Sequence, residues 1–388
     1  MGIRRATRLL VLLAALAGTA WLAAPALSVQ PYLPQAVDFE QRLPTVRELA
    51  PKSAAARAAD PRDPFHPAAD GPIRFQTDPI RAPRRFDAVG LAREIRSLEF
   101  RARKSGRPWG PWAETADGNP LYVGGADYVQ VRSRTFKPAG RLHYVNVTGS
   151  ATPVSRVLSG ARRALNSAFL SAASVLDSPA EAIPDKPKMT SRSAWGANRD
   201  SGGCKPRNDP DYGEVRGAAV HHTATSNKYR YSEGPGIVLA ICRYHRNANG
   251  WSDIGYNALA DKYGRTYAGR EDGDLEGPAV AKPVVGAHAG GQNSVTTGIA
   301  TIGTHTSKKM NNKAFYALRA FLAWKLELHG VTNAFTYITY NNGRVARTLT
   351  THRTLVKGTQ YATSCPGDAG ASQMPALRTA TQRRMDNH

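Results

Sequence analysis

The sequence predicts an α/β domain with a central sheet, preceded by a small β-rich domain. Two patterns carry this prediction. Strand-like and helix-like segments alternate from about residue 189 onward, whereas alternation of apolar and polar residues with a period of two dominates residues 72–149. With 388 residues, the chain has room for one medium and one small domain, each with its own core.

The first residues have the composition of a targeting segment. A cluster of arginines precedes an apolar stretch from Leu9 to Ala24, and the small residues that follow suit a signal peptidase. The stretch is short for a membrane span, so residues 1–28 are expected to be either a cleaved signal peptide or an uncleaved anchor. The protein is therefore expected to be exported, and to be secreted or associated with a cell wall.

The next segments lead into the β-rich domain. Residues 29–71 are rich in Pro, Ala, Arg and Asp without sustained periodicity, which predicts a mostly irregular or extended segment. Within residues 72–149, Leu98, Phe100 and Ala102 fall on one face of an expected strand, with charged residues between them. The aromatic residues of this domain are interpreted either as a carbohydrate-stacking face or as core: Trp109, Trp112, Tyr122, Tyr128 and Tyr144.

A helix is expected between the two domains. Apolar residues from Val154 to Leu176 recur at helical spacing, which indicates an amphipathic helix that packs on a domain or lies on a membrane surface. Three prolines then mark a linker, so residues 150–188 are expected to connect the domains.

The second domain is expected to span residues 189–381, with residues 382–388 as a tail. Its long helix has apolar residues from Phe315 to Leu326 on one face and ends at Gly330. A further helix is expected at residues 235–245, and strands are expected at residues 217–225, 254–260, 265–269 and 297–303.

The charge of the chain restricts its partners. A formal net charge of +22 predicts attraction to anionic wall polymers, to carboxylate-rich peptidoglycan stems or to anionic lipid headgroups. Nucleic acid is disfavoured as a partner, because the basic residues are scattered and no nucleic-acid-binding module accompanies them. Membrane contact is expected only through the N-terminal segment, if it is not cleaved.

Two imidazoles and a thiolate indicate a metal site. One histidine of the pair His221 and His222, together with His352 and Cys365, would make an incomplete tetrahedral shell for Zn²⁺, and a fourth position left to water is the mark of a catalytic site. His221 and His222 are neighbours in an expected strand and face opposite sides, so only one of them can reach the metal from a given face. Periodicity alone leaves open which one does.

The cysteine count agrees with this interpretation. The chain has three cysteines, so at least one stays unpaired. If Cys365 is a metal thiolate, Cys204 and Cys242 remain for a disulfide, although Cys242 also suits a buried small apolar side chain.

Several segments resemble the peptidoglycan recognition protein and type-2 N-acetylmuramoyl-L-alanine amidase family. They occur in the family's order and cover about residues 189–381, and the matching segments are Ser191–Ala197, Val220–Ala224, Gly250–Asn257, Gly286–Ala289, Thr351–Arg353 and Ser364–Gly367. More weakly, Phe86–Leu91 and Ala126–Arg132 resemble an N-terminal domain that accompanies this amidase in exported actinobacterial proteins.

The resemblance implies a fold and a site. The fold would be a central mixed β-sheet flanked by helices, with His221, His352 and Cys365 as zinc ligands. Tyr256 would be the catalytic tyrosine, which donates to the oxyanion or positions the water, and Thr363 a polar catalytic helper or a loop-capping residue. The substrate would be the amide between N-acetylmuramic acid and L-alanine in peptidoglycan and its muropeptides. The residues expected to line the substrate groove are His222, Arg270, His288 and Asn293.

Two departures from the family pattern stand out. The spacing from His352 to Cys365 is longer than most members show, so residues 354–362 are expected to bulge. Ala268 stands where the family usually has Glu, which weakens the substrate role inferred for Arg270.

Two functions compete: a zinc amidase and a non-catalytic peptidoglycan-binding protein on the same fold. Because binding-only relatives typically lose a metal ligand, the presence of Cys365 favours the enzyme. A zinc protease is disfavoured, since the sequence has no His-Glu-x-x-His helix.

Overall fold

The computed structural model describes residues 35–49, 72–115, 118–148, 184–273 and 280–388. The expected signal segment and the helix expected between Val154 and Leu176 lie outside these ranges. Within them, no helix combines the length and the apolar composition needed to cross a bilayer.

The N-terminal domain is an antiparallel sheet. In the described residues it contains eight strands, with the order β1-β8-β4-β7-β3-β2 and with β5 joining β6 to β7. The strands are β1 (Val37–Arg42), β2 (Val46–Glu48), β3 (Phe75–Thr77), β4 (Ile80–Leu91), β5 (Leu98–Arg103), β6 (Ala113–Thr115), β7 (Leu121–Ser133) and β8 (Arg141–Asn146). In β5, Leu98, Phe100 and Ala102 are buried as their alternation predicted.

This domain starts earlier than the sequence suggested. The segment 29–71 was expected to be mostly irregular or extended, and within it residues 37–42 and 46–48 form the strands β1 and β2. β1 is an edge strand that pairs with β8 and has no buried residue, and its alternation of apolar and polar residues is limited to Val37 and Phe39, which is too short to mark a strand.

The aromatic residues of the domain have two fates. Tyr122 and Tyr144 are buried in the core. The guanidinium of Arg101 lies over the rings of Trp109 and Trp112, at 4.8 and 4.6 Å from their centroids. Arg132 lies 4.1 Å from the centroid of Trp112 as well. These two tryptophans therefore stack on arginines of the same domain.

The C-terminal domain has a mixed central sheet, as predicted. Among the described residues, six strands follow the order β16-β10-β13-β11-β12-β9. The pairs from β16 to β11 are parallel, whereas β11 and β12 are antiparallel. The strands are β9 (Met189–Thr190), β10 (Gly217–His222), β11 (Ala258–Ala260), β12 (Thr266–Ala268), β13 (Thr296–Thr301) and β16 (Leu349–Thr351), and β14 (Tyr337–Thr339) pairs with β15 (Val345–Arg347) beside the sheet.

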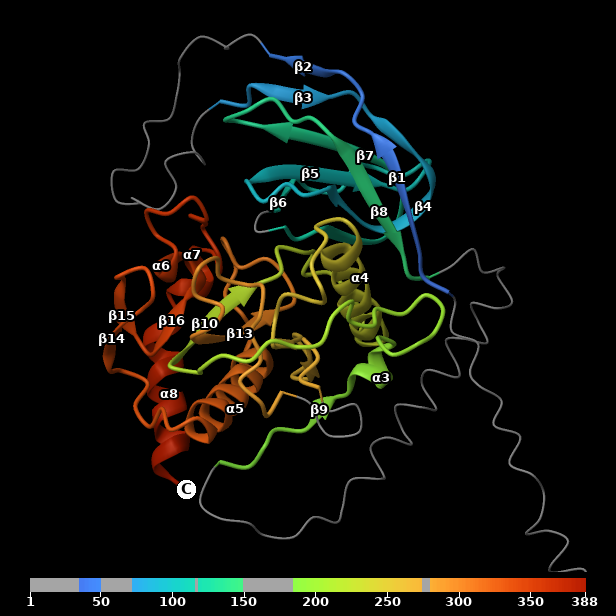
Figure 1. Ribbon diagram of the computed structural model, residues 1–388. Coiled ribbons are helices and arrows are strands. Elements are labelled where there is room, and N and C mark those ends of the chain that lie inside the picture. Colours follow the sequence, from blue (N-terminus) through green and yellow to red (C-terminus); the bar gives the residue numbers. More distant parts are fainter. Residues whose placement is uncertain (1–34, 50–71, 116–117, 149–183, 274–279) are drawn as a thin grey trace, which may run out of the picture.

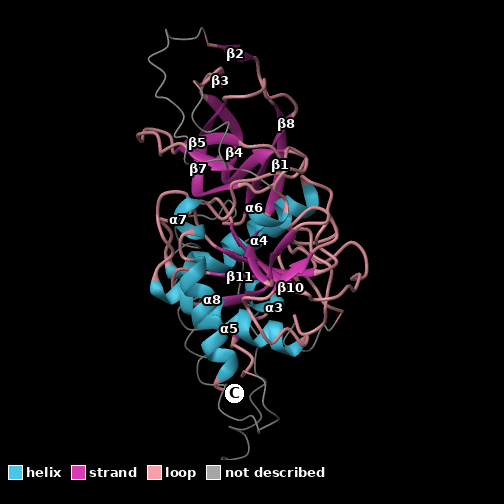
Figure 2. Cartoon of the chain, turned by 90° about the vertical axis from the view of Figure 1, so that its left-hand side faces the viewer, coloured by secondary structure: helices cyan, strands magenta, loops and turns pink. Residues whose placement is uncertain are grey.

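Helices cover both faces of this sheet (Figures 1 and 2). One face packs against α4 (Gly234–Asn247), and the other packs against α5 (Asn312–Leu328) and α8 (Met374–Asp386). The shorter helices are α3 (Arg192–Trp195), η1 (Tyr231–Glu233), α6 (His352–Leu355) and α7 (Asp368–Ala371). Because Met385 is buried in the core, α8 extends the domain into the segment 382–388, which was expected to be a tail.

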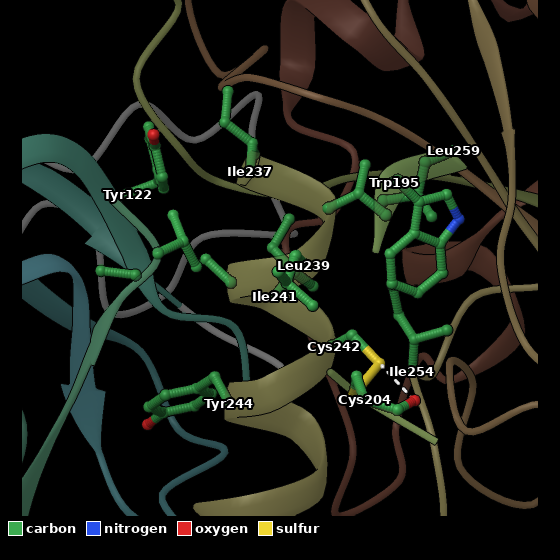
Figure 3. Close-up of a cluster of buried hydrophobic side chains, with 14 of the residues drawn as sticks. Tyr122, Trp195, Cys204, Ile237, Leu239, Ile241, Cys242, Tyr244, Ile254 and Leu259 are labelled. Carbon is green, nitrogen blue, oxygen red and sulfur yellow. Dashed lines mark hydrogen bonds between the residues drawn. A yellow bond between two sulfur atoms is a disulfide. The ribbon is translucent and has the colours of Figure 1, made fainter. Parts of the chain in front are cut away.

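Helix α4 is apolar on more than one side, and its position explains why. It lies between the N-terminal sheet and the C-terminal sheet (Figure 1). Figure 3 shows Tyr244 directed toward the N-terminal domain, while Leu259 and Trp195 lie on the other side of the helix. Every residue from Ile237 to His245 is buried, as expected for a helix that packs on both sides. The two domains therefore share one cluster of buried apolar side chains, in addition to the clusters within each domain.

Polar contacts fix the two domains to each other. The hydroxyl of Tyr244 donates to the carbonyl of Leu91 at 2.9 Å, and Arg243 pairs with Asp38 at 2.8 Å. Gly90 faces the ring of Tyr244, and a Cβ at this position would collide with the phenol. A glycine is therefore required where the N-terminal sheet meets α4.

A disulfide joins Cys204 to Cys242 and fixes the loop after α3 to α4 (Figure 3). We expect the double variant Cys204→Ala, Cys242→Ala to lower the free energy of unfolding by about 3 to 4 kcal/mol, because the bond closes a loop of 38 residues. Guanidinium denaturation measures this loss, and reduced wild-type protein should show the same midpoint as the variant. Equal stability of oxidised wild type and variant would contradict the prediction.

Candidate metal centre and active site

The ends of two strands and one loop bring the expected metal ligands together. His221 is the second-last residue of β10, and His352 directly follows β16. Since β10 and β16 are parallel neighbours, both histidines lie at the same edge of the sheet. Cys365 lies in the loop that leads to α7 and is held there by a hydrogen bond from the Arg353 amide to its carbonyl, at 2.9 Å.

The three side chains form a compact buried group. One ligand atom from each of His221, His352 and Cys365 lies within 4.8 Å of the other two. The Nδ1 atom of His221 is 3.7 Å from Cys365 Sγ, and the ring centroids of His221 and His352 are 4.6 Å apart. The structure therefore gathers all three residues at one point.

His288 orients His221. Its Nε2 atom lies 3.4 Å from the carbonyl of Thr296, which can only accept, so this nitrogen carries the proton. The Nδ1 atom of His288 then accepts from Nε2 of His221 at 3.1 Å. This order leaves the lone pair of His221 Nδ1 directed toward Cys365, in the way that outer partners fix metal-binding histidines.

Burial keeps these histidines neutral. Burial away from water is the main reason why the pKa of His221 lies well below its usual range, and the nearby His352 lowers this pKa further. Burial likewise lowers the pKa of His288 to about 3. Neutral imidazole is the form that binds metals.

The backbone of His222 contacts the sulfur of Cys365. Its N–H lies 3.4 Å from Cys365 Sγ, and its carbonyl lies 3.8 Å from the same atom. The hydroxyl of Thr363 accepts from the Cys365 amide at 3.1 Å, so this side chain shapes the loop. The donor set of two imidazoles and one thiolate fits Zn²⁺.

His222 faces away from this group. His221 is aligned with Ala300 and Leu259, which pack on the α4 side of the sheet, so the adjacent His222 points toward the other face. There its Nδ1 accepts from the His305 amide at 3.0 Å. The structure thus distinguishes the two histidines, which periodicity alone could not, and does not bring the His222 ring to the groove.

Arg270 and Asn293 brace the site through backbone contacts. Arg270 donates to the carbonyls of Ile254 and Val285, at 3.1 and 2.9 Å, and so joins the segments that precede Tyr256 and His288. Asn293 Oδ1 accepts from the backbone amide of His288 at 2.8 Å. Both residues were expected to line the groove, and the contacts found for them hold the site in shape.

Tyr256 lies beside the metal ligands. Its ring centroid is 5.3 Å from that of His221, and only 3% of its surface is exposed. The Tyr256 hydroxyl donates to Asn119 Oδ1 at 2.9 Å, and Asn119 belongs to the N-terminal domain. The site is therefore built from both domains.

A cleft lies between the domains, and its lining includes Arg353 and Thr363, which are close in sequence to the ligands His352 and Cys365. Its volume is about 1130 Å³, and both domains line it. The bulge expected at residues 354–362 contributes Lys357, Gly358 and Ala362 to its wall. Six cationic side chains and two carboxylates line it: Arg132, Arg134, Lys228, Lys308, Arg353 and Lys357, with Glu99 and Glu114.

Comparison with known proteins agrees with this geometry. Residues 211–368, which contain the three candidate ligands and Tyr256, match the family described as N-acetylmuramoyl-L-alanine amidase. The C-terminal domain belongs to this family. The amidase-family domain accordingly combines a mixed sheet with a site at the ends of its parallel strands.

Individual relatives of the amidase-family domain are distant. Peptidoglycan-recognition protein SC2 of Drosophila melanogaster is 28% identical over 162 residues, which is 41% of this chain and 78% of that protein. The N-acetylmuramoyl-L-alanine amidase of Sus scrofa is 29% identical over 197 residues, 49% of this chain and 27% of that protein. The solved structure of wild-type Drosophila PGRP-LB is 21% identical, covers 49% of this chain and 93% of its own, and has a TM-score of 0.38.

Two residues of the site, Asn119 and His245, could not be assigned to it from the sequence. Asn119 carried no signal beyond the turn-forming sequence Gly118-Asn119-Pro120. His245 was included only as the end of an expected helix. Its Nδ1 accepts from the Gly255 amide at 3.1 Å, and its ring lies 5.8 Å from that of Tyr256.

Proposed function

We propose that this protein is a zinc-dependent N-acetylmuramoyl-L-alanine amidase, which hydrolyses the amide between N-acetylmuramic acid and L-alanine in peptidoglycan. The observation that carries the proposal is the complete ligand set, in which His221, His352 and Cys365 lie together next to Tyr256. A protein that only binds peptidoglycan has no need of this set.

The residues of the chain have separable tasks in this proposal. His221, His352 and Cys365 would hold the zinc, which when bound lowers the pKa of a water toward neutrality and polarises a carbonyl. His288 keeps His221 in the tautomer that presents Nδ1. Tyr256 places its ring 5.3 Å from that of His221, and its buried hydroxyl is held in a defined position by Asn119.

The decisive test is the mass spectrum of purified muropeptides after incubation with the full chain and zinc. We expect release of intact stem peptides with a free N-terminal L-alanine. Binding of muropeptides without any such release would support the competing function, a recognition protein. Cleavage at another bond would contradict both.

The interdomain cleft is the proposed site of the stem peptide. Its lining carries a net charge of four positive, from six cations and two carboxylates, and the stems of peptidoglycan carry carboxylates. Its volume of about 1130 Å³ exceeds the usual range for small-molecule pockets, as an extended peptide requires.

We expect the double variant Lys228→Glu, Lys308→Glu to raise KM for muropeptides about tenfold, because each reversal replaces an attraction by a repulsion near the surface. The matched control is Lys313→Glu, an exposed residue of α5 outside the cleft, which should leave KM within about twofold of wild type. The effect should weaken as salt is added. Equal KM values for the double variant and the control would contradict the proposal that the stem peptide binds in the interdomain cleft.

We propose an exported location for the protein. The disulfide between Cys204 and Cys242 supports it, since such bonds persist mainly in oxidising compartments outside the cytoplasm. Fractionation of the producing cells tests this, and recovery of the reduced protein in the cytoplasm would contradict it.

A further inference from the structure

The loop between β6 and β7 of the N-terminal domain reaches the centre of the amidase-family domain. Gly118, Asn119 and Pro120 are all buried there. Gly118 adopts a φ of 72°, and its carbonyl accepts from Asn249 Nδ2 at 2.8 Å. A Cβ on Gly118 would come within 3.3 Å of the Trp251 ring, so the loop is fixed directly against the segment that leads to Tyr256.

The directions of the hydrogen bonds at Asn119 follow from one backbone amide. The Gly255 N–H can only donate, so His245 Nδ1 accepts from it at 3.1 Å. The proton of His245 is then on Nε2, which donates to Asn119 Oδ1 at 3.3 Å. Burial is the main reason why the pKa of His245 is lowered to about 3, and the positive charge of nearby Arg270 lowers it further. His245 is therefore neutral at neutral pH.

The same oxygen of Asn119 lies 2.9 Å from the Tyr256 hydroxyl, with which it forms a hydrogen bond. Since His245 requires an acceptor at this position, the amide group of Asn119 cannot be turned to offer its nitrogen. Tyr256 must therefore be the donor in its bond to Asn119.

We propose that Asn119 is a positioning residue of the active site, supplied by the N-terminal domain, which acts by holding the Tyr256 phenol. A phenol has one O–H donor, and here its hydrogen bond is accepted by Asn119 Oδ1. While this bond holds, Tyr256 meets the reacting groups as an acceptor. It thus orients a water, and does not donate to the oxyanion. This inference rests on the proposed amidase function and deepens it.

The primary test compares Asn119→Leu with Asn119→Asp in the full chain. Leucine removes the acceptor at nearly the same volume, so kcat should fall about tenfold or more while KM changes less than about threefold. Aspartate keeps an oxygen acceptor and should recover most of kcat. The matched control Tyr244→Phe removes another bond between the domains, away from Tyr256, and should leave kcat within about twofold.

A double-mutant cycle shows whether Asn119 acts through Tyr256. In a Tyr256→Phe background, Asn119→Leu should cause no further loss of kcat. If Asn119→Leu lowers kcat by the same factor in the Tyr256→Phe background as in wild type, Asn119 does not act through Tyr256 and is only a structural residue of the interface. An increase of kcat in Asn119→Leu would mean that the loop restrains the enzyme, and would overturn the proposal.

A second measurement is independent of catalysis. In the metal-free full chain, the shifts in denaturation midpoint caused by Asn119→Leu and by Tyr256→Phe should not add, because both remove the same bond. Additive shifts would show that the two side chains are not coupled, and the proposal would fail. If wild-type protein leaves muropeptides uncut, the amidase function fails, while this cycle still decides whether Asn119 holds Tyr256.

Discussion

Replacing Cys365 by serine should abolish tight zinc binding and reduce kcat/KM by about 10³ or more, since metal activation contributes several kcal/mol to such hydrolyses. The physical reason is that a neutral hydroxyl replaces a thiolate in a group whose ligand atoms lie within 4.8 Å of one another. Metal content after dialysis and the rate of muropeptide cleavage measure the two effects.

The control for this prediction uses histidines. His352→Gln removes another ligand and should behave as Cys365→Ser does. His329→Gln makes the same chemical change at the end of α5, where the ring contacts the carbonyl of Ala281, and should change neither zinc content nor rate. Full activity in Cys365→Ser would contradict the proposed metal site.

Replacing Tyr256 by phenylalanine should lower kcat by about 10² to 10³ while zinc content stays at the wild-type level, because a positioned hydroxyl acts on the reacting groups and not on the ligands. Stability should fall by about 1 kcal/mol, since the buried Asn119 oxygen loses one donor. Steady-state kinetics and thermal unfolding of the zinc-loaded and metal-free protein measure both.

Tyr340→Phe is the matched control. It also removes a buried hydroxyl that donates to a carbonyl, that of Arg347 at 3.0 Å, but lies outside the candidate site. Its kcat should equal that of wild type. If the two variants lose the same activity, Tyr256 has no special role.

The sequence predicted much of the C-terminal domain because its elements have strong periodicity and its motifs are local. The apolar face of α5 and the buried run of α4 required helices, and the structure contains both. The expected ligands His221, His352 and Cys365 also lie together. Each of them stands in a short motif that can be recognised without knowledge of the fold.

The rest depended on contacts between distant segments. β1 lies at the edge of a sheet, and its two alternating apolar residues, Val37 and Phe39, are too few to reveal it. Asn119 reaches Tyr256 across 137 positions of sequence, and a single asparagine in a turn gives no sign of such a partner. Arg270 and Asn293 were expected to line the substrate groove; their contacts with the backbone around the site came from the structure alone, and their contact with a substrate stays a prediction.

Helix α4 has a consequence for how the chain can be divided. Its residues from Ile237 to His245 are covered on one side by the N-terminal sheet, so removal of that sheet would expose a continuous apolar surface to water. Heat should therefore melt the two domains in one calorimetric transition, and the amidase-family domain expressed alone should aggregate. In evolutionary terms, the N-terminal domain could not be exchanged for an unrelated module without redesign of α4.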